Sequence, residues 1–148
     1  MNPKSVTKTI EILLVEDNPG DIRLTREVLK EGHIPNHLHV VEDGEQAIAF
    51  LKHTGPYLQA PCPDLIVLDL NLPRRGGLEV LQAVKTSQSL MHIPVIVFTT
   101  SQAEDDIMSA YNLHANCYIT KPIDLQQFIN SVRSIEDFWL NMVQLPSE

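Results

Sequence analysis

Residues 64–73 read Asp64-Leu-Ile-Val-Leu-Asp69-Leu-Asn71-Leu-Pro73, and this stretch is the strongest indication of the fold. A short, almost wholly apolar run is typical of a strand buried on both faces of a parallel sheet. Carboxylates are rarely buried unless they are paired or bound to a metal. We therefore expect Asp69 at the carboxyl end of this strand, where open α/β sheets bind their ligands.

Strands and helices alternate along the rest of the chain. We expect strands at residues 10–15, 38–41, 64–69, 94–99 and 117–119, with a helix after each one. Asn18, Asp43 and Asp124 are expected to cap three of the helices, and Gly32 to end the first helix in a left-handed conformation. Regular alternation with short connections predicts a doubly wound, flavodoxin-like α/β fold with the parallel strand order 2-1-3-4-5.

The composition indicates one ordinary globular domain. Of 148 residues, 43% are hydrophobic, which is enough for one core, and the net charge of −8 argues against nucleic acid as a partner. No apolar run is long enough for a membrane span, and Cys62 and Cys117 have no paired spacing, so we expect a reducing cytoplasm. We expect a flexible N-terminus at residues 1–9, the folded domain at residues 10–134 and an extension of the last helix at residues 135–148.

Polar side chains follow four of the five predicted strands. These are Glu16 and Asp17 after the first, Asp69 and Asn71 at the third, Thr99 and Ser101 at the fourth, and Lys121 and Pro122 after the fifth. Because the first and third strands are neighbours in this order, Asp17 and Asp69 should converge. Separately, each residue has an ordinary explanation, such as a solvated turn or a surface lysine. Their coincidence at four strand ends favours a site.

This set of residues suits phosphoryl transfer to a carboxylate. Asp69 would be the nucleophile, Lys121 would neutralise its charge, and the Thr99 hydroxyl would donate to a phosphoryl oxygen. Mg²⁺, for which Mn²⁺ can substitute, would be bound by Asp17, by Asp69 and by the Asn71 carbonyl, with Glu16 acting through water.

The same residues resemble the receiver domain of two-component response regulators over residues 10–133. The motifs that carry the resemblance are Leu14-Val-Glu16-Asp17-Asn18, Leu68-Asp69-Leu-Asn-Leu-Pro73, Pro94-Val-Ile-Val-Phe-Thr99 and Tyr118-Ile-Thr-Lys121-Pro122. The resemblance implies a signalling protein rather than an enzyme, in which Asp69 accepts phosphate from a histidine kinase in a Mg²⁺-dependent reaction. It also implies that Thr99 and Tyr118 form a switch pair and that the Lys121–Pro122 peptide is cis.

The apolar pattern of the last helix continues beyond the receiver match. Phe138, Trp139 and Met142 are therefore candidates for a homodimer interface. The segment Glu136–Leu140 and the long proline-rich loop 53–63 resemble stand-alone regulators partnered with phytochrome-type kinases. This implies a light-sensing kinase and a further, unknown downstream partner, since the chain stops at Glu148 without room for an output domain. Alternatively, Trp139 folds back onto the molecule, over the 53–63 loop.

Three other functions are alternatives to this one. A receiver-like scaffold that is never phosphorylated would not need Asp17, Asp69, Thr99 and Lys121 together. A flavodoxin-type electron carrier is disfavoured because Glu16 and Asp17 would repel a flavin phosphate. A phosphohydrolase with an aspartyl nucleophile is disfavoured because Asn71 stands where a general acid is needed.

Overall fold

The computed structural model describes residues 8–146, so most of the expected N-terminal segment lies outside them. Within this range five strands form one parallel sheet in the order β2-β1-β3-β4-β5, which confirms the predicted fold. The strands are β1 (Ile10–Val15), β2 (Asn36–Val41), β3 (Leu65–Leu68), β4 (Val95–Thr99) and β5 (Cys117–Thr120). Val15 at the end of β1 pairs with Val41 on β2 and with Leu68 on β3, so the carboxyl ends of these strands are level.

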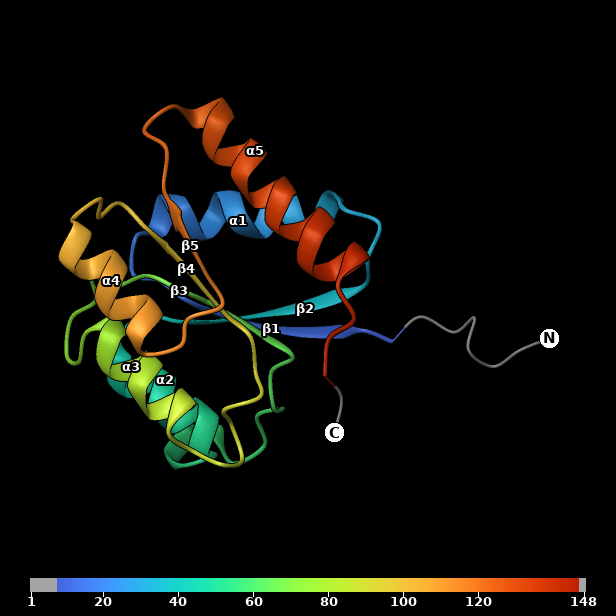
Figure 1. The fold of residues 1–148 in the computed structure, drawn as a ribbon. Coiled ribbons are helices and arrows are strands. Elements are labelled where there is room, and N and C mark those ends of the chain that lie inside the picture. Colours follow the sequence, from blue (N-terminus) through green and yellow to red (C-terminus); the bar gives the residue numbers. More distant parts are fainter. Residues whose placement is uncertain (1–7, 147–148) are drawn as a thin grey trace.

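The helices cover both faces of the sheet (Figure 1). They are α1 (Pro19–Glu31), α2 (Gly44–Lys52), α3 (Gly77–Lys85), α4 (Glu104–Asn112) and α5 (Leu125–Ile135), with a short 3₁₀ turn at Gly55–Tyr57. Val28 of α1 and Val132 of α5 belong to the apolar cluster on one face. Phe50 of α2, Val80 of α3 and Ala110 of α4 belong to the cluster on the other face. Within residues 8–146, no helix is both long and apolar enough to cross a bilayer.

The three predicted N-caps are confirmed. The side chains of Asn18, Asp43 and Asp124 accept hydrogen bonds from backbone N–H groups in the first turns of α1, α2 and α5. The prediction for Gly32 is wrong, because its φ of −71° and ψ of 168° are extended. Glycine serves close packing there, since a Cβ on Gly32 would overlap the carboxyl group of Glu136. His114, by contrast, adopts the left-handed conformation, with a φ of 71°.

The last helix does continue beyond the receiver match, as a π-helix at Glu136–Met142. Leu140 is buried, whereas Phe138 and Met142 are 50% and 73% exposed. Trp139 packs partly against the cluster between the sheet and α5, on the face opposite to the one that receives Tyr57 of the proline-rich loop. The placement of Trp139 over that loop is therefore wrong.

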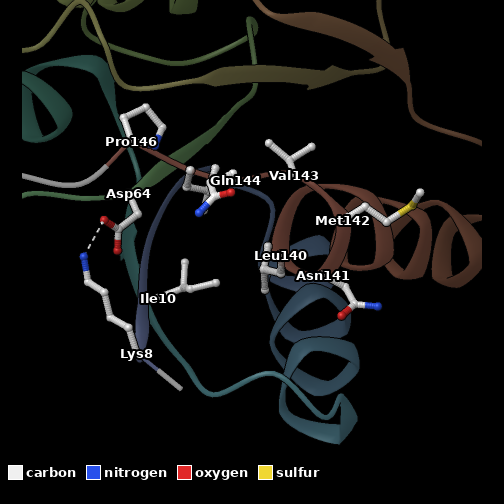
Figure 2. Close-up of a pocket in the computed structure, with 10 residues that line it drawn as sticks. Lys8, Ile10, Asp64, Leu140, Asn141, Met142, Val143, Gln144 and Pro146 are labelled. Atoms are coloured by element: carbon white, nitrogen blue, oxygen red, sulfur yellow. Dashed lines mark hydrogen bonds and ion pairs between the residues drawn. The ribbon is translucent and has the colours of Figure 1, made fainter. Parts of the chain in front are cut away.

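The C-terminal residues after the π-helix turn back along the amino ends of the strands. Leu140 to Pro146 form one side of an open pocket of about 370 Å³, and Lys8, Ile10 and Asp64 form the other (Figure 2). This pocket lies where β1 and β3 begin. It is therefore at the opposite edge of the sheet from the predicted carboxylate site.

Candidate functional site

The carboxyl edge of the sheet brings the predicted residues together. The backbone N–H of Asp69 donates to the Val15 carbonyl at 3.0 Å, which extends the pairing of β1 with β3. The N–H of Lys121 likewise donates to the Thr99 carbonyl at 2.7 Å. Parallel pairing of β1, β3, β4 and β5 thus places residues that are far apart in sequence at one edge.

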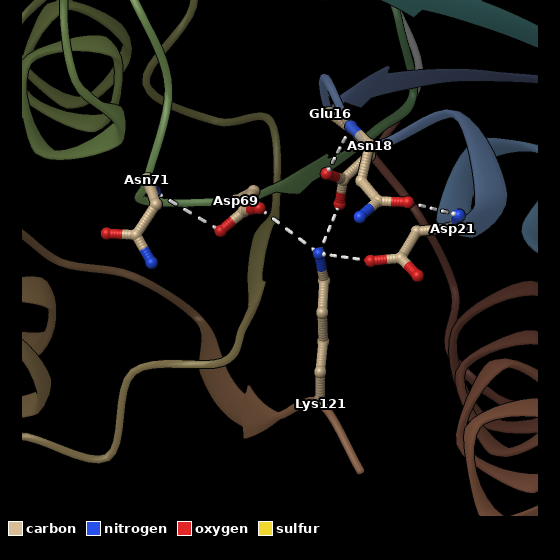
Figure 3. Close-up of polar contacts among 6 residues, drawn as sticks. All are labelled: Glu16, Asn18, Asp21, Asp69, Asn71 and Lys121. Carbon is tan, nitrogen blue, oxygen red and sulfur yellow. Dashed lines mark hydrogen bonds and ion pairs between the residues drawn. The ribbon is translucent and has the colours of Figure 1, made fainter. Parts of the chain in front are cut away.

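Lys121 is the centre of this site (Figure 3). Its Nζ donates to Glu16 Oε1 at 2.5 Å, to Asp21 Oδ2 at 2.9 Å and to Asp69 Oδ2 at 3.1 Å. The Lys121 side chain is only 3% exposed. An ammonium group has three protons to donate, so these carboxylates satisfy all of them.

Burial and charge act against each other on this group of side chains. Burial disfavours the charged form of Lys121, but the hydrogen bonds to Glu16 and Asp21 raise its pKa above the ordinary lysine value. Burial raises the pKa of Glu16 to about 7, although Lys121 acts in the opposite direction. The site therefore keeps a positively charged lysine beside a carboxylate that is costly to ionise.

Three carboxylates in the site are arranged to hold a cation. Ligand oxygens of Glu16, Asp17 and Asp69 lie within 4.8 Å of one another, and Asp17 is exposed. Oxygen ligands and an open, hydrated side suit Mg²⁺ or Mn²⁺. Both Glu16 oxygens already have donors, Lys121 Nζ and the Asn18 N–H at 3.1 Å, which fits a role for Glu16 through water rather than by direct ligation.

Asn71 is positioned by a hydrogen bond to Asp69. Its backbone N–H donates to Asp69 Oδ1 at 3.2 Å, while its side chain points away from Asp69 (Figure 3). The two oxygens of Asp69 are therefore held by different partners, Oδ1 by Asn71 and Oδ2 by Lys121. The Asn71 carbonyl as a metal ligand stays a prediction.

Thr99 presents a buried hydroxyl to this edge of the sheet. It is fully buried, and its Oγ1 has no hydrogen-bond partner among residues 8–146. An unpaired buried hydroxyl costs free energy, and a bound group that accepts its hydrogen bond would offset this cost. An anionic oxygen bound between Asp69 and Lys121 would be such a ligand.

Tyr118 of β5 pairs with Val97 of β4, two residues before the pair formed by Thr120 and Thr99. Its hydroxyl donates to the Ser101 carbonyl at 2.9 Å. Burial is the main cause that raises the pKa of the Tyr118 phenol, which therefore stays protonated as a donor. The Ser101 hydroxyl in turn donates to Asp106 Oδ2 at 2.6 Å, which ties the β4–α4 loop to the start of α4.

The predicted cis peptide is wrong, because the Lys121–Pro122 bond is trans. For a bond before proline, the intrinsic preference for trans is about 0.5–1 kcal/mol, so the sequence alone does not fix the isomer. With the trans bond, the Lys121 amine still reaches its three carboxylates.

Asp21 is the functional residue that sequence reasoning missed. It lies in the first turn of α1 and accepts a hydrogen bond from Lys121. The sequence signal was weak, because an acidic residue in the first turn of a helix is already explained by the helix dipole. What the sequence could not show is that Lys121, which follows β5, lies within hydrogen-bond distance of that turn.

Comparisons with known proteins agree with this geometry. The response regulator receiver domain matches residues 12–133. Response regulator Rcp1 of Synechocystis sp. is 49% identical over 136 residues, which are 92% of this chain and 92% of the relative. The crystal structure of the Mn(2+)-bound form of Rcp1 superposes with a TM-score of 0.92 at 48% identity, covering 93% of this chain and 99% of that one.

A second solved structure is equally similar. The phosphorylated cyanobacterial phytochrome response regulator RcpA superposes with a TM-score of 0.92 at 48% identity, covering 95% of this chain and all of that one. The family match spans most of the chain, and the acidic pocket for a divalent metal is present in Glu16, Asp17 and Asp69. This chain belongs to the response regulator receiver domain family.

Proposed function

We propose that the protein is a response regulator that accepts a phosphoryl group on Asp69 from a histidine kinase. The observation that carries the proposal is the pair of groups that flank Asp69 at the sheet edge. Lys121 holds one Asp69 oxygen, and the buried Thr99 hydroxyl lacks a partner among the described residues. Together they would surround the oxygens of a phosphoryl group bound to Asp69.

In the transfer step, an oxygen of Asp69 attacks phosphorus, and the bond from phosphorus to the donor imidazole breaks. Asn71 and Lys121 fix the orientation of the attacking carboxylate. A divalent cation bound by Asp17 and Asp69 would supply positive charge to the phosphoryl oxygens. The Lys121 ammonium offsets the remaining negative charge as a point charge.

The signal would leave the site through Thr99 and Tyr118. A phosphoryl oxygen gives the Thr99 hydroxyl its missing partner and draws it toward Asp69. Tyr118 donates a hydrogen bond to the Ser101 carbonyl and is only partly buried. Its release from Ser101 would change the surface formed by β4, α4 and β5.

The relatives support a phytochrome-type kinase as the phosphate donor, because RcpA is a phytochrome response regulator. We further propose that the protein acts as a homodimer through the exposed Phe138 and Met142, with a separate downstream protein as the target. In this role the chain promotes only its own phosphorylation and dephosphorylation.

Incorporation of phosphate from acetyl phosphate, with Mg²⁺ or with chelator, tests the proposal. We expect an acyl phosphate in the wild type with Mg²⁺, and none in Asp69→Asn. Asp64→Asn is a matched control, because Asp64 lies at the other end of the same strand and accepts the Glu11 N–H. If the folded wild type incorporates no phosphate, the result would instead favour a receiver-like scaffold that is not phosphorylated.

A further inference from the structure

The loop between β3 and α3 rests directly on the first turn of α2. The Gly44 N–H of α2 donates to the Pro73 carbonyl at 3.4 Å. A Cβ on Gly44 would overlap the backbone carbonyl of Arg75. The loop that follows the phosphoacceptor thus touches an element that contributes no residue to the carboxylate site.

An ion pair joins the same two segments. Arg74 donates from Nε at 3.1 Å and from Nη2 at 2.8 Å, both to Asp43 Oδ2. The other oxygen, Asp43 Oδ1, accepts the Gln46 N–H at 2.7 Å and so caps α2. Asp43 is 2% exposed, and although burial opposes its charge, Gln46 and Arg74 lower its pKa. The buried carboxylate of Asp43 therefore caps the start of α2 and also holds the loop 70–77.

The loop needs to be held because its backbone is strained. Arg74 and Arg75 have φ values of 47° and 84°, in the left-handed region that residues other than glycine rarely adopt. Such conformations persist only where the surroundings enforce them, and they concentrate at functional sites. Here the enforcing contacts are the Arg74–Asp43 ion pair and the contact of Arg75 with Gly44.

The same loop is tied to the phosphoacceptor at both of its ends. At its start, the Asn71 N–H donates to Asp69 Oδ1 at 3.2 Å. At its end, the Gly77 N–H donates to the Leu70 carbonyl at 3.0 Å, and a Cβ on Gly77 would overlap the Asp69 carbonyl. A change of backbone conformation in the middle of the loop would therefore displace groups that contact Asp69, which are only a few residues away.

We infer that Arg74 and Asp43 are positioning residues, whose ion pair keeps the loop 70–77 in the strained conformation in which Asn71 orients Asp69. This inference rests on the proposed function, phosphorylation of Asp69. Without the ion pair the loop relaxes, the Asn71 N–H leaves Asp69 Oδ1, and the carboxylate loses its fixed direction. Orientation of reacting groups contributes strongly to rate, and a misplacement of about 1 Å can cost about a hundredfold.

The test is the rate of acyl phosphate formation from acetyl phosphate at saturating Mg²⁺ in Arg74→Gly, in Asp43→Ser and in the double variant. Serine keeps a cap for α2, and glycine accepts the left-handed backbone. We expect each single variant to lower the maximal rate roughly tenfold, which is part of the loss that misplacement can cause. The acetyl phosphate concentration at half-maximal rate should not change. The double variant should be no slower than either single one.

Two further variants separate positioning from a general effect on the fold. Arg75→Gly removes the same kind of strain but leaves both the ion pair and the backbone carbonyl that contacts Gly44, so its rate should equal that of the wild type. Arg74→Lys should recover most of the rate, because both Arg74 contacts go to a single oxygen that an ammonium group can also reach. Thermal unfolding identifies the variants that are folded. If Asp43→Ser does not fold, the comparison of Arg74→Gly with Arg74→Lys is sufficient to test the inference.

The outcomes that overturn the inference are distinct from failure of the proposed function. Wild-type rates in folded Arg74→Gly, additive losses in the double variant, or Arg74→Lys as slow as Arg74→Gly would each reject the positioning role. In all three cases the wild type is phosphorylated, so the proposed function stands. A wild type that takes no phosphate would reject the proposed function and the positioning role together.

Discussion

The positive charge of Lys121 balances part of the negative charge of this site. Its ammonium group is buried among Glu16, Asp21 and Asp69. Buried ion pairs contribute little relative to apolar packing, but removal of one partner leaves uncompensated charge. The carboxylates that would bind a cation are therefore kept in place by a lysine that offsets part of their repulsion.

Lys121→Met should lower the free energy of unfolding by about 3–5 kcal/mol at neutral pH, because the remaining buried carboxylates lose their cation. It should also abolish phosphate incorporation. Urea unfolding at pH 7 measures the first effect. A matched control is Lys85→Met, because Lys85 donates only to backbone carbonyls of Met91 and Ile93. Equal losses in the two variants would contradict the special role of Lys121.

Thr99→Val separates stability from signalling. The hydroxyl has no partner among the described residues, so its replacement by a methyl group of similar size should leave the free energy of unfolding within about 1 kcal/mol of wild type, or raise it. Phosphate should still be accepted, but the environment of Tyr118 should no longer respond. Tyrosine fluorescence or NMR shifts of Tyr118, measured with and without acetyl phosphate, provide the readout. A normal response in Thr99→Val would contradict the switch.

The C-terminal π-helix contains a side chain whose burial costs stability. Glu136 is buried against Gly32, and its Oε2 has no hydrogen-bond partner within residues 8–146. Burial raises the pKa of Glu136 above 4.5, with Asp137 adding to the effect and His33 and Arg133 opposing it. Because the protonated form is favoured in the folded state, this residue costs stability as pH rises.

Glu136→Gln should therefore stabilise the protein by about 1 kcal/mol at neutral pH. The gain over wild type should be absent below the unfolded pKa of about 4.5, grow as pH rises, and level off above the folded-state pKa. Thermal unfolding at a series of pH values measures this difference. A gain that is constant with pH, or one that grows as pH falls, would contradict the burial of an ionised carboxyl group.

The elements that were predictable are those specified by local pattern. Apolar runs of β-branched residues mark β3 and β4, and cap residues mark the starts of α1, α2 and α5. The carboxylate site followed from these because it lies at strand ends. The extended Gly32 and the Arg74–Asp43 pair were not predictable, because each depends on a partner far away in sequence. The cis Lys121–Pro122 bond was expected from the resemblance alone, and no local pattern decides the isomer.

The exposed side chains of the π-helix are the observation that supports the proposed homodimer of the whole molecule. Phe138 and Met142 are exposed, whereas Trp139 packs partly into its own chain. A Trp139→Ala variant would therefore weaken the fold as well as any interface. The pair Phe138 and Met142 is the cleaner target.

The double variant Phe138→Ser, Met142→Ser should shift the protein toward monomer in sedimentation velocity, because aromatic and apolar anchors dominate such interfaces. Its midpoint of thermal unfolding at low protein concentration should change little. Leu58→Ser, Met91→Ser is a matched control, since both side chains are exposed and lie outside the π-helix. An unchanged mass distribution in the π-helix variant would contradict this interface.

We propose Asp69 as the single phosphoacceptor among the aspartates of this protein. The most direct measurement is borohydride reduction of the protein after acetyl phosphate and Mg²⁺ treatment, followed by peptide mass spectrometry, because reduction converts a phosphorylated aspartate to homoserine. We predict homoserine at position 69 alone, and none when Mg²⁺ is removed by chelator. Homoserine at another aspartate, or an unmodified chain after treatment of folded protein, would contradict the account.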